Sequence, residues 1–209
     1  MEQIFYRYKV VLKDRNIIIS MLYGFLFLSF SLVINYYASV YATIMASNTV
    51  TDLILNNMPI INFDKIYTEG FLLFELFIAF ILLHEPKKIP FALKTIALFI
   101  LIRSAFIVLT HLAPPPTDLS GIGVDSLSNK INFSADLFFS GHAGLPFLLA
   151  LVFWDIPWLK WTFLSLSIIF AFTVLLGHHH YSIDVFAAYF ITYGIFKIAE
   201  RFFERFDNI

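Results

Sequence analysis

Long apolar runs restrict what this chain can fold into more than any other feature. Several runs approach the ~20 apolar residues that a helix needs to cross a bilayer. Only 14% of the 209 residues are charged, far fewer than in a soluble domain of this size. The sequence therefore predicts an all-α, polytopic integral membrane protein, a six-transmembrane-helix bundle that forms one domain over residues 1–209. The predicted spans cover about 17–40, 67–84, 91–112, 136–154, 158–176 and 182–198.

Composition excludes several other classes of protein. The net charge of −1 gives no reason to expect a nucleic-acid partner. The chain has no cysteine, which excludes disulfides and thiolate metal sites. A basic N-terminal segment precedes the apolar run at about 17–40, which is longer than a signal-peptide core. We therefore expect this run to be retained as the first span.

The basic residues predict an orientation. With the six spans above, eleven of the 14 lysines and arginines fall on one side of the membrane, whereas only Lys65 and Lys130 fall on the other and Arg103 lies within a span. The positive-inside rule then places both termini in the cytoplasm. The connections at 41–66 and 113–135 would face the periplasm, lumen or exterior, together with the turn at 178–180. This is expected of a microbial inner or plasma membrane protein, or of a Golgi-type endomembrane protein.

His180 and Asp184 form the most specific motif. Side chains at i and i+4 lie on one helix face, and a carboxylate on one ring nitrogen fixes the imidazole tautomer and leaves the other nitrogen free to react. Asp184 lies about one turn inside the sixth predicted span, where a carboxylate is costly and usually functional. The alternative is an interfacial histidine hydrogen-bonded to a structural aspartate.

A second histidine follows a small Ser-Gly pair, in Ser140-Gly141-His142 near the start of the fourth predicted span. Small residues allow successive backbone N–H groups to converge on a phosphate, and a helix start adds its positive dipole end. The alternative is a Ser-Gly kink with a structural histidine. Asp136 would position this loop or cap a helix.

Two charged residues fall inside the predicted spans, Arg103 in the third and Glu75 in the second. An arginine within the membrane is expensive, so a partner is expected. Arg103 and Glu75 would form a structural ion pair, or Arg103 would bind a substrate phosphate while Glu75 orients it. The three consecutive histidines at 178–180 are not expected to chelate a metal, because they point in different directions and no acidic cluster accompanies them.

These residues resemble the sphingomyelin synthase family, within the wider type 2 phosphatidic acid phosphatase superfamily. Residues 176–185 and 188–192 are similar to the family's His-x-His-Tyr-Thr-x-Asp-Val segment and its Ala-Tyr-Tyr-Ile-Thr continuation, and residues 136–142 to its Asp-Tyr-Leu-Phe-Ser-Gly-His segment. The superfamily's phosphatases carry an Arg-Pro and a Ser-Arg where this chain has Ala113-Pro114 and Thr173-Val174. That departure favours the synthase branch.

The resemblance implies a six-span bundle with a catalytic histidine pair and aspartate on the exoplasmic side, and no cofactor. Carried over, His180 would be the nucleophile, Asp184 its partner and His142 the acid–base group, while Ser140, Gly141, Arg103, Asp136 and Glu75 would bind substrate. The expected reaction moves phosphocholine or phosphoethanolamine from a glycerophospholipid to a lipid alcohol (ceramide or diacylglycerol) through a phosphohistidine. With water as the acceptor, the same site would be a phospholipase C or a lipid phosphate phosphatase. A lipid-binding or transporter-like membrane protein is the non-enzymatic alternative.

Overall fold

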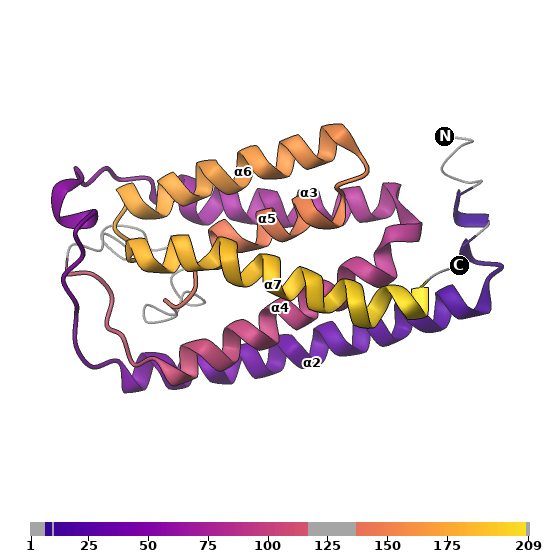
Figure 1. Cartoon of the computed structure of the whole chain (residues 1–209), viewed down its shortest axis with the longest axis horizontal. Coiled ribbons are helices and arrows are strands. Elements are labelled where there is room, and N and C mark those ends of the chain that lie inside the picture. Colours follow the sequence, from indigo (N-terminus) through magenta and orange to yellow (C-terminus); the bar gives the residue numbers. More distant parts are fainter. Residues whose placement is uncertain (1–6, 10, 117–136, 208–209) are drawn as a thin grey trace.

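The fold is a bundle of helices that run up and down along one long axis (Figure 1). The computed structural model describes residues 7–9, 11–116 and 137–207. Within them no β-strand occurs, and one isolated parallel bridge joins Asn48 to Leu112. The long helices are α2 (Arg15–Met45), α3 (Phe71–His84), α4 (Ile89–Leu109), α5 (Gly141–Val152), α6 (Pro157–Leu176) and α7 (Ser182–Asp207), and the short turns are η1 (Leu55–Asn57), η2 (Ile66–Gly70) and η3 (Pro86–Lys88).

Five helical segments of the described residues are long and apolar enough to cross a membrane: Arg15–Met45, Ile66–His84, Pro86–Leu109, Pro157–Leu176 and Ser182–Phe203. The predicted span at 136–154 is the exception. Residues 137–140 are not helical, and α5 has 12 residues, which gives a length of about 18 Å against the ~30 Å of a bilayer core. The prediction of an all-helical membrane protein is confirmed, whereas the prediction that 136–154 forms a full-length spanning helix is wrong.

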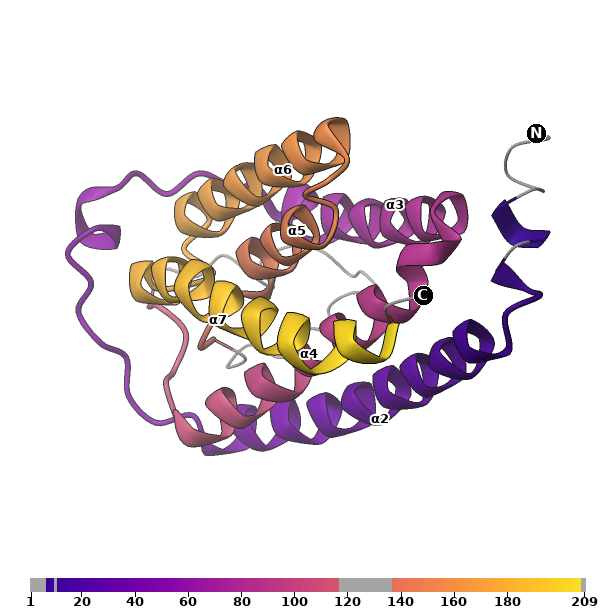
Figure 2. The ribbon, with the colours of Figure 1, turned by 45° about the vertical axis from the view of Figure 1, so that its right-hand side comes forward.

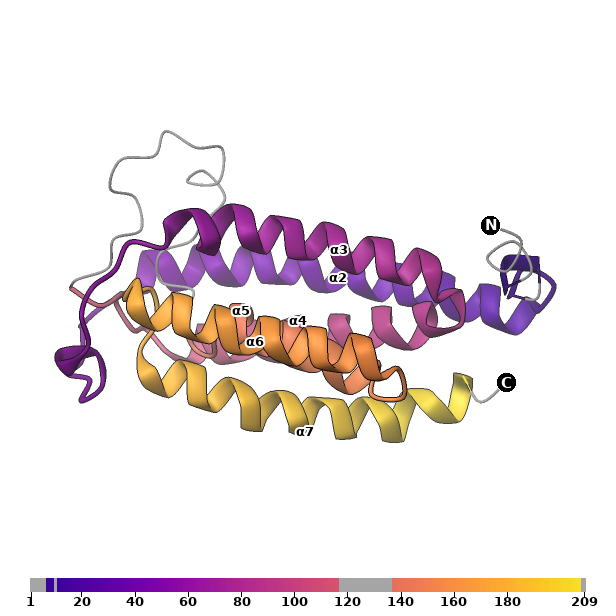
Figure 3. The ribbon, with the colours of Figure 1, turned by 90° about the horizontal axis from the view of Figure 1, so that it is seen from above.

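The helices pack in two groups. α2 lies along α4, and α5 is enclosed by α6 and α7 (Figures 1 and 3). The face of α2 toward α4 carries small residues that let the two backbones approach closely, as is common in membrane helices. A Cβ atom on Gly24 would lie 3.0 Å from Leu93 Cβ. The buried residues of α2 are Gly24, Ser31, Ala38, Ser39 and Ala42.

The core gathers around α5, and phenylalanines fill much of it. Leu148 and Leu149 of α5 are fully buried, and Phe163 of α6 packs edge-on against Phe74 of α3 at a ring-centroid distance of 6.2 Å. By contrast, many apolar side chains on the outer faces of α2, α3 and α7 are exposed. Exposed apolar helix faces are the expected lipid-facing surface of a membrane bundle.

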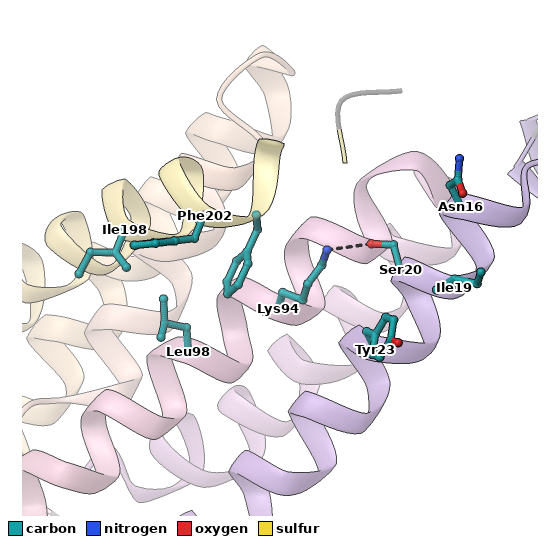
Figure 4. A pocket seen from close by; sticks show the side chains of 9 residues that line it. Asn16, Ile19, Ser20, Tyr23, Lys94, Leu98, Ile198 and Phe202 are labelled. Carbon is teal, nitrogen blue, oxygen red and sulfur yellow. Dashed lines mark hydrogen bonds between the residues drawn. The ribbon is translucent and has the colours of Figure 1, made fainter. Parts of the chain in front are cut away.

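The two ends of the bundle differ. The start of α2 and the end of α7 lie at one end, and the starts of α3, α5 and α7 lie at the other (Figures 1 and 2). The predicted cytoplasmic location of the termini stays a prediction. At the end where α7 finishes, a groove of about 650 Å³ runs between α2, α4 and α7, with Lys94 Nζ donating to Ser20 Oγ at 2.7 Å (Figure 4). Its lining residues are Asn16, Ile19, Ser20, Tyr23, Lys94, Leu98, Ile198, Phe202 and Phe203.

Candidate active site at the start of α5 and α7

The triple histidine lies in the turn that joins α6 to α7. Two backbone hydrogen bonds end α6, from His179 N to Val174 O (2.9 Å) and from His178 N to Leu175 O (3.1 Å). This is the Schellman pattern, and His178 occupies its left-handed position with φ 56°. Glycine is the usual residue there, because other residues are strained at positive φ. Beyond this reversal, His179 and His180 face different aspartates, Asp64 and Asp184.

His180, in the turn before α7, lies against Asp184 in the first turn of that helix. The predicted contact forms, whereas the prediction that both residues share one helix face is wrong, because α7 begins only at Ser182. His180 Nδ1 is 3.4 Å from Asp184 Oδ2, and the two side chains are 3% and 0% exposed. Asp184 Oδ2 also accepts a hydrogen bond from Tyr181 N at 3.0 Å, which fixes the carboxylate. The 3.4 Å contact is longer than a hydrogen bond, and such contacts often tighten only in the substrate complex. The pairing leaves His180 Nε2 as the nitrogen directed away from its aspartate.

Ser140 brings the second histidine motif to the same place. Its hydroxyl caps α5 by accepting from Ala143 N, and its backbone N–H donates to Asp184 O at 3.1 Å. This last bond ties the start of α5 directly to the first turn of α7. Gly141 is the first residue of α5, so the unpaired N–H groups and the positive dipole end of that helix lie beside the His180–Asp184 pair.

His142, the second residue of α5, is half-buried in this cluster. Its Nε2 atom lies 3.2 Å from the carbonyl oxygen of Tyr67. A carbonyl can only accept, so this contact is a hydrogen bond when the proton is on Nε2. His142 therefore directs Nδ1 away from Tyr67.

Arg103 reaches the Ser-Gly-His turn from α4. Its Nε donates to Phe139 O at 2.8 Å, and a Cβ atom on Gly141 would lie 3.4 Å from Nε. Glycine at 141 therefore permits the close approach of the guanidinium to the start of α5. Arg103 forms no ion pair with Glu75, whose side chain lies on the exposed face of α3. The expected Arg103–Glu75 contact is wrong, because the arginine turns toward α5 rather than toward α3.

Tyr67, Asp64 and His179 complete the cluster, and the sequence analysis assigned them no role. The Tyr67 ring stacks on His142 at 4.2 Å and on His179 at 4.1 Å, and His179 Nε2 lies 3.4 Å from Asp64 Oδ1. Tyr67 and Asp64 come from the start of α3 and the loop before it. No motif spacing connects that loop to α6 and α7, and the π-helical geometry of η2 is a feature of functional sites that only the structure reveals.

Asp52 fastens the loop before α3 to the start of α7. Its carboxylate accepts from Ser182 N (2.6 Å) and Ser182 Oγ (3.0 Å), and from the backbone N–H groups of Ile54 and Leu55. Burial acts to raise the pKa of Asp52, but these hydrogen bonds together outweigh it and lower the pKa below its usual value. The ionised Asp52 thus satisfies a free N–H group at the start of α7.

Two predicted site features need separate mention. Asp136 lies outside the described residues, so its predicted role is untested. Within residues 7–9, 11–116 and 137–207, no group of three or more His, Asp or Glu side chains is arranged to hold a metal ion.

Comparison with known proteins matches the segment that carries both histidine motifs. Residues 134–201 match the family described as PAP2 superfamily C-terminal. The match covers His142, His180 and Asp184, and it confirms the predicted resemblance to this superfamily over that segment. Phosphatidylcholine:ceramide cholinephosphotransferase 1 of Gallus gallus is 35% identical over 79 residues, which are 34% of this chain and 18% of that relative. The chain therefore aligns with about a fifth of the length of this curated relative, and no solved structure gives a significant match.

Proposed function

We propose that this protein is a lipid phosphotransferase that moves a phospho head group from a glycerophospholipid to a lipid alcohol. The observation that carries the proposal is the meeting of two histidine motifs at one helix start. Ser140 N bonds to Asp184 O at 3.1 Å, which brings the Ser-Gly-His motif to the aspartate that faces His180. The similarity to a phosphatidylcholine:ceramide cholinephosphotransferase supports this class of donor and acceptor.

In the first half-reaction the donor is a phospholipid such as phosphatidylcholine or phosphatidylethanolamine. Its phosphate would bind at the first N–H groups of α5, with Arg103 beside them. His180 Nε2 attacks phosphorus, and the bond from phosphorus to the diacylglycerol oxygen breaks. His142 donates its proton to that leaving oxygen, so diacylglycerol departs as a neutral alcohol and the head group remains on His180 as a phosphohistidine.

The second half-reaction reverses these roles. His142, now neutral, accepts the proton of an incoming hydroxyl such as that of ceramide or diacylglycerol. The hydroxyl oxygen attacks phosphorus, and the bond from phosphorus to His180 Nε2 breaks. Asp184 stabilises the positive charge that the His180 ring carries while Nε2 is bonded to phosphorus, and the ring is neutral again once that bond has broken. The enzyme then returns to its starting protonation state.

A turnover assay tests this proposal. The purified full chain is given a fluorescent phospholipid with and without ceramide, and the products are separated. A phosphocholine–ceramide or phosphoethanolamine–ceramide product supports the synthase, and diacylglycerol formed without a ceramide product identifies a phospholipase C. Inorganic phosphate released from phosphatidic acid identifies a phosphatase. Absence of turnover with every donor would reject the enzymatic proposal in favour of a lipid-binding protein.

Two variants assign the chemistry to the histidines. His180→Ala and His142→Ala are each expected to reduce kcat by at least about 10³-fold, because one removes the nucleophile and the other the acid–base group. His84→Ala is the matched control, since His84 lies at the far end of α3 and bonds to Phe80 O. Retained activity in either site variant would contradict the assignment.

A further inference from the structure

His142 is held by residues that lie outside both histidine motifs. Tyr67 belongs to the π-helical turn η2, and Asp64 lies in the helical turn that leads directly into it. Both precede residues 134–201, which match the known family. A role for them must therefore be argued from their contacts with the site.

Tyr67 contacts His142 in two ways. Its ring stacks on the imidazole with centroids 4.2 Å apart and an interplanar angle of 18°, and its backbone oxygen lies 3.2 Å from Nε2. The stacking restricts rotation of the His142 ring, and the carbonyl selects the tautomer with the proton on Nε2. Tyr67 thus supports His142 by a ring face and a backbone acceptor, whereas His180 depends on a carboxylate.

Tyr67 is itself supported from its other side. His179 stacks on it at 4.1 Å with an interplanar angle of 29°. Two rings that both stack about 4 Å from one tyrosine cannot share a face of it, so His142 and His179 enclose the Tyr67 ring between them. The three rings form one continuous stack near the starts of α3, α5 and α7.

Asp64 fixes the far end of this stack. Its Oδ1 lies 3.4 Å from His179 Nε2, and the two side chains are 13% and 2% exposed. Asn62 donates to the other carboxylate oxygen at 3.1 Å. Gly177 leaves room for the ring beside the same nitrogen, because a Cβ there would lie 2.5 Å from Nε2. The His179 ring therefore has little freedom to move.

We propose that Asp64, His179 and Tyr67 form a positioning assembly that holds His142 in its Nε2-protonated tautomer, with Nδ1 directed to the reacting phosphate group. The inference rests on the proposed function, since it assigns Nδ1 as the atom of His142 that exchanges protons with the lipid oxygens. None of the three residues contacts the reacting atoms in this account. They act on the rate through the orientation of His142, to which proton transfer is sensitive.

Kinetics provide one test of the assembly. Tyr67→Leu is expected to lower kcat by about 10–100-fold and Asp64→Asn by about 10-fold, each with KM changed by less than about 2-fold, because orientation of an acid–base group acts on the chemical step. Tyr67→Phe retains the ring and the carbonyl and should restore activity to within about 2-fold of the parent. Glu69→Gln is the matched control, since Glu69 is an exposed carboxylate on the same turn.

The tautomer of His142 provides a second test that needs no turnover. The chain has six histidines, and their ring nitrogens can be observed by ¹⁵N NMR of histidine-labelled full-length protein, with His142 assigned by its loss in His142→Gln. At a pH where the His142 ring is neutral, the parent, Tyr67→Phe and Glu69→Gln should show its proton on Nε2, whereas Tyr67→Leu and Asp64→Asn should show a mixture of tautomers.

Each outcome decides one of the two proposals. A neutral His142 ring with its proton on Nδ1 in the parent, or an unchanged signature in both Tyr67→Leu and Asp64→Asn, would overturn the positioning assembly. A loss in Tyr67→Phe equal to that in Tyr67→Leu would also overturn it, because the hydroxyl and not the stack would then matter. If the parent turns over no lipid but the predicted tautomer pattern is observed, the proposed function fails and the assembly stands as a structural feature.

Discussion

Two adjacent histidines each face an aspartate at the same distance, but their partners come from different regions of the molecule. His180, in the turn before α7, lies 3.4 Å from Asp184 in the first turn of that helix. His179 also lies 3.4 Å from its aspartate, Asp64, but α3 to α6 separate the two residues along the chain. The first pair is set by local chain geometry at the start of α7, and the second by the docking of a distant segment.

The two pairs therefore differ in which changes to the protein would disrupt them. The His180–Asp184 pair needs only the first turn of α7 and the bond from Tyr181 N. The His179–Asp64 pair depends on the loop at 46–65 remaining against α7, which Asp52 and its bonds to Ser182 secure. A local pair withstands changes elsewhere, whereas a tertiary pair is sensitive to every contact that docks its loop.

The largest expected effect separates the two pairs by the same substitution. Asp184→Asn should lower kcat by about 10²–10⁴-fold, because an amide can favour the wrong tautomer of His180 and cannot stabilise its imidazolium form. Asp64→Asn, which acts only through positioning, should cost about 10-fold. Steady-state assays on fluorescent phospholipid measure both. Equal losses in the two variants would remove the distinction drawn between them.

Arg103 belongs to neither pair. Substituting it tests whether positive charge at the start of α5 contributes to kcat independently of the two His–Asp pairs. Arg103→Gln should lower kcat by about 10²-fold, because it removes positive charge from the phosphate site. Arg103→Lys retains the charge but loses the planar donor group that bonds to Phe139 O, so we expect it to recover only part of the activity. Lys88→Gln serves as the control, since Lys88 pairs with Asp155 at the other end of the bundle. Full activity in Arg103→Gln would exclude a phosphate role.

Gly177→Ala should damage the tertiary pair and spare the local one. The added Cβ would lie 2.5 Å from His179 Nε2, so the ring must leave Asp64 and Tyr67. We expect a loss of about 1–3 kcal/mol in the free energy of unfolding and a reduction of kcat near that of Asp64→Asn. Gly194→Ala is the matched control, because nothing lies within 4 Å of its added Cβ. A Gly177→Ala protein with parental kcat would argue against the positioning assembly.

The smallest expected effect concerns the pH dependence of the docked loop. The pKa of Asp52 is lower in the folded protein than its ordinary value of 3.8. Its ionised form therefore stabilises the fold above that value, and the contribution is lost as the pH falls through the lowered folded pKa. Asp52→Asn should lower the free energy of unfolding at pH 7 by about 1 kcal/mol, as for loss of a helix cap.

Thermal unfolding of the parent and Asp52→Asn in detergent, measured from pH 7 to pH 3, tests this sign. The difference in Tm between the two proteins should shrink toward the acid end of the series. A difference that grows as the pH falls would contradict the assigned direction of the Asp52 pKa.

Much of the fold could be predicted, because a helix that crosses a membrane is recognised from a continuous run of apolar residues. The predicted spans at 67–84 and 158–176 nearly coincide with the helical segments Ile66–His84 and Pro157–Leu176. The span predicted at 136–154 was wrong because the apolar run continues through residues 137–140, which the structure uses as an irregular entry into α5. Hydropathy cannot distinguish an apolar helix from an apolar segment buried among other helices.

The residues of the site likewise divide into those predicted from local sequence and those placed by tertiary packing. The sequence by itself determined the apolar helices and the contact of His180 with Asp184, because both depend on residues that are close together in the chain. Only the tertiary structure decided that Arg103 meets the start of α5 rather than Glu75, that Ser140 bonds to Asp184, and that Asp64 and Tyr67 support His142 through His179. These contacts join residues far apart in the chain, and the periodicity of a single sequence does not show which helix ends pack together.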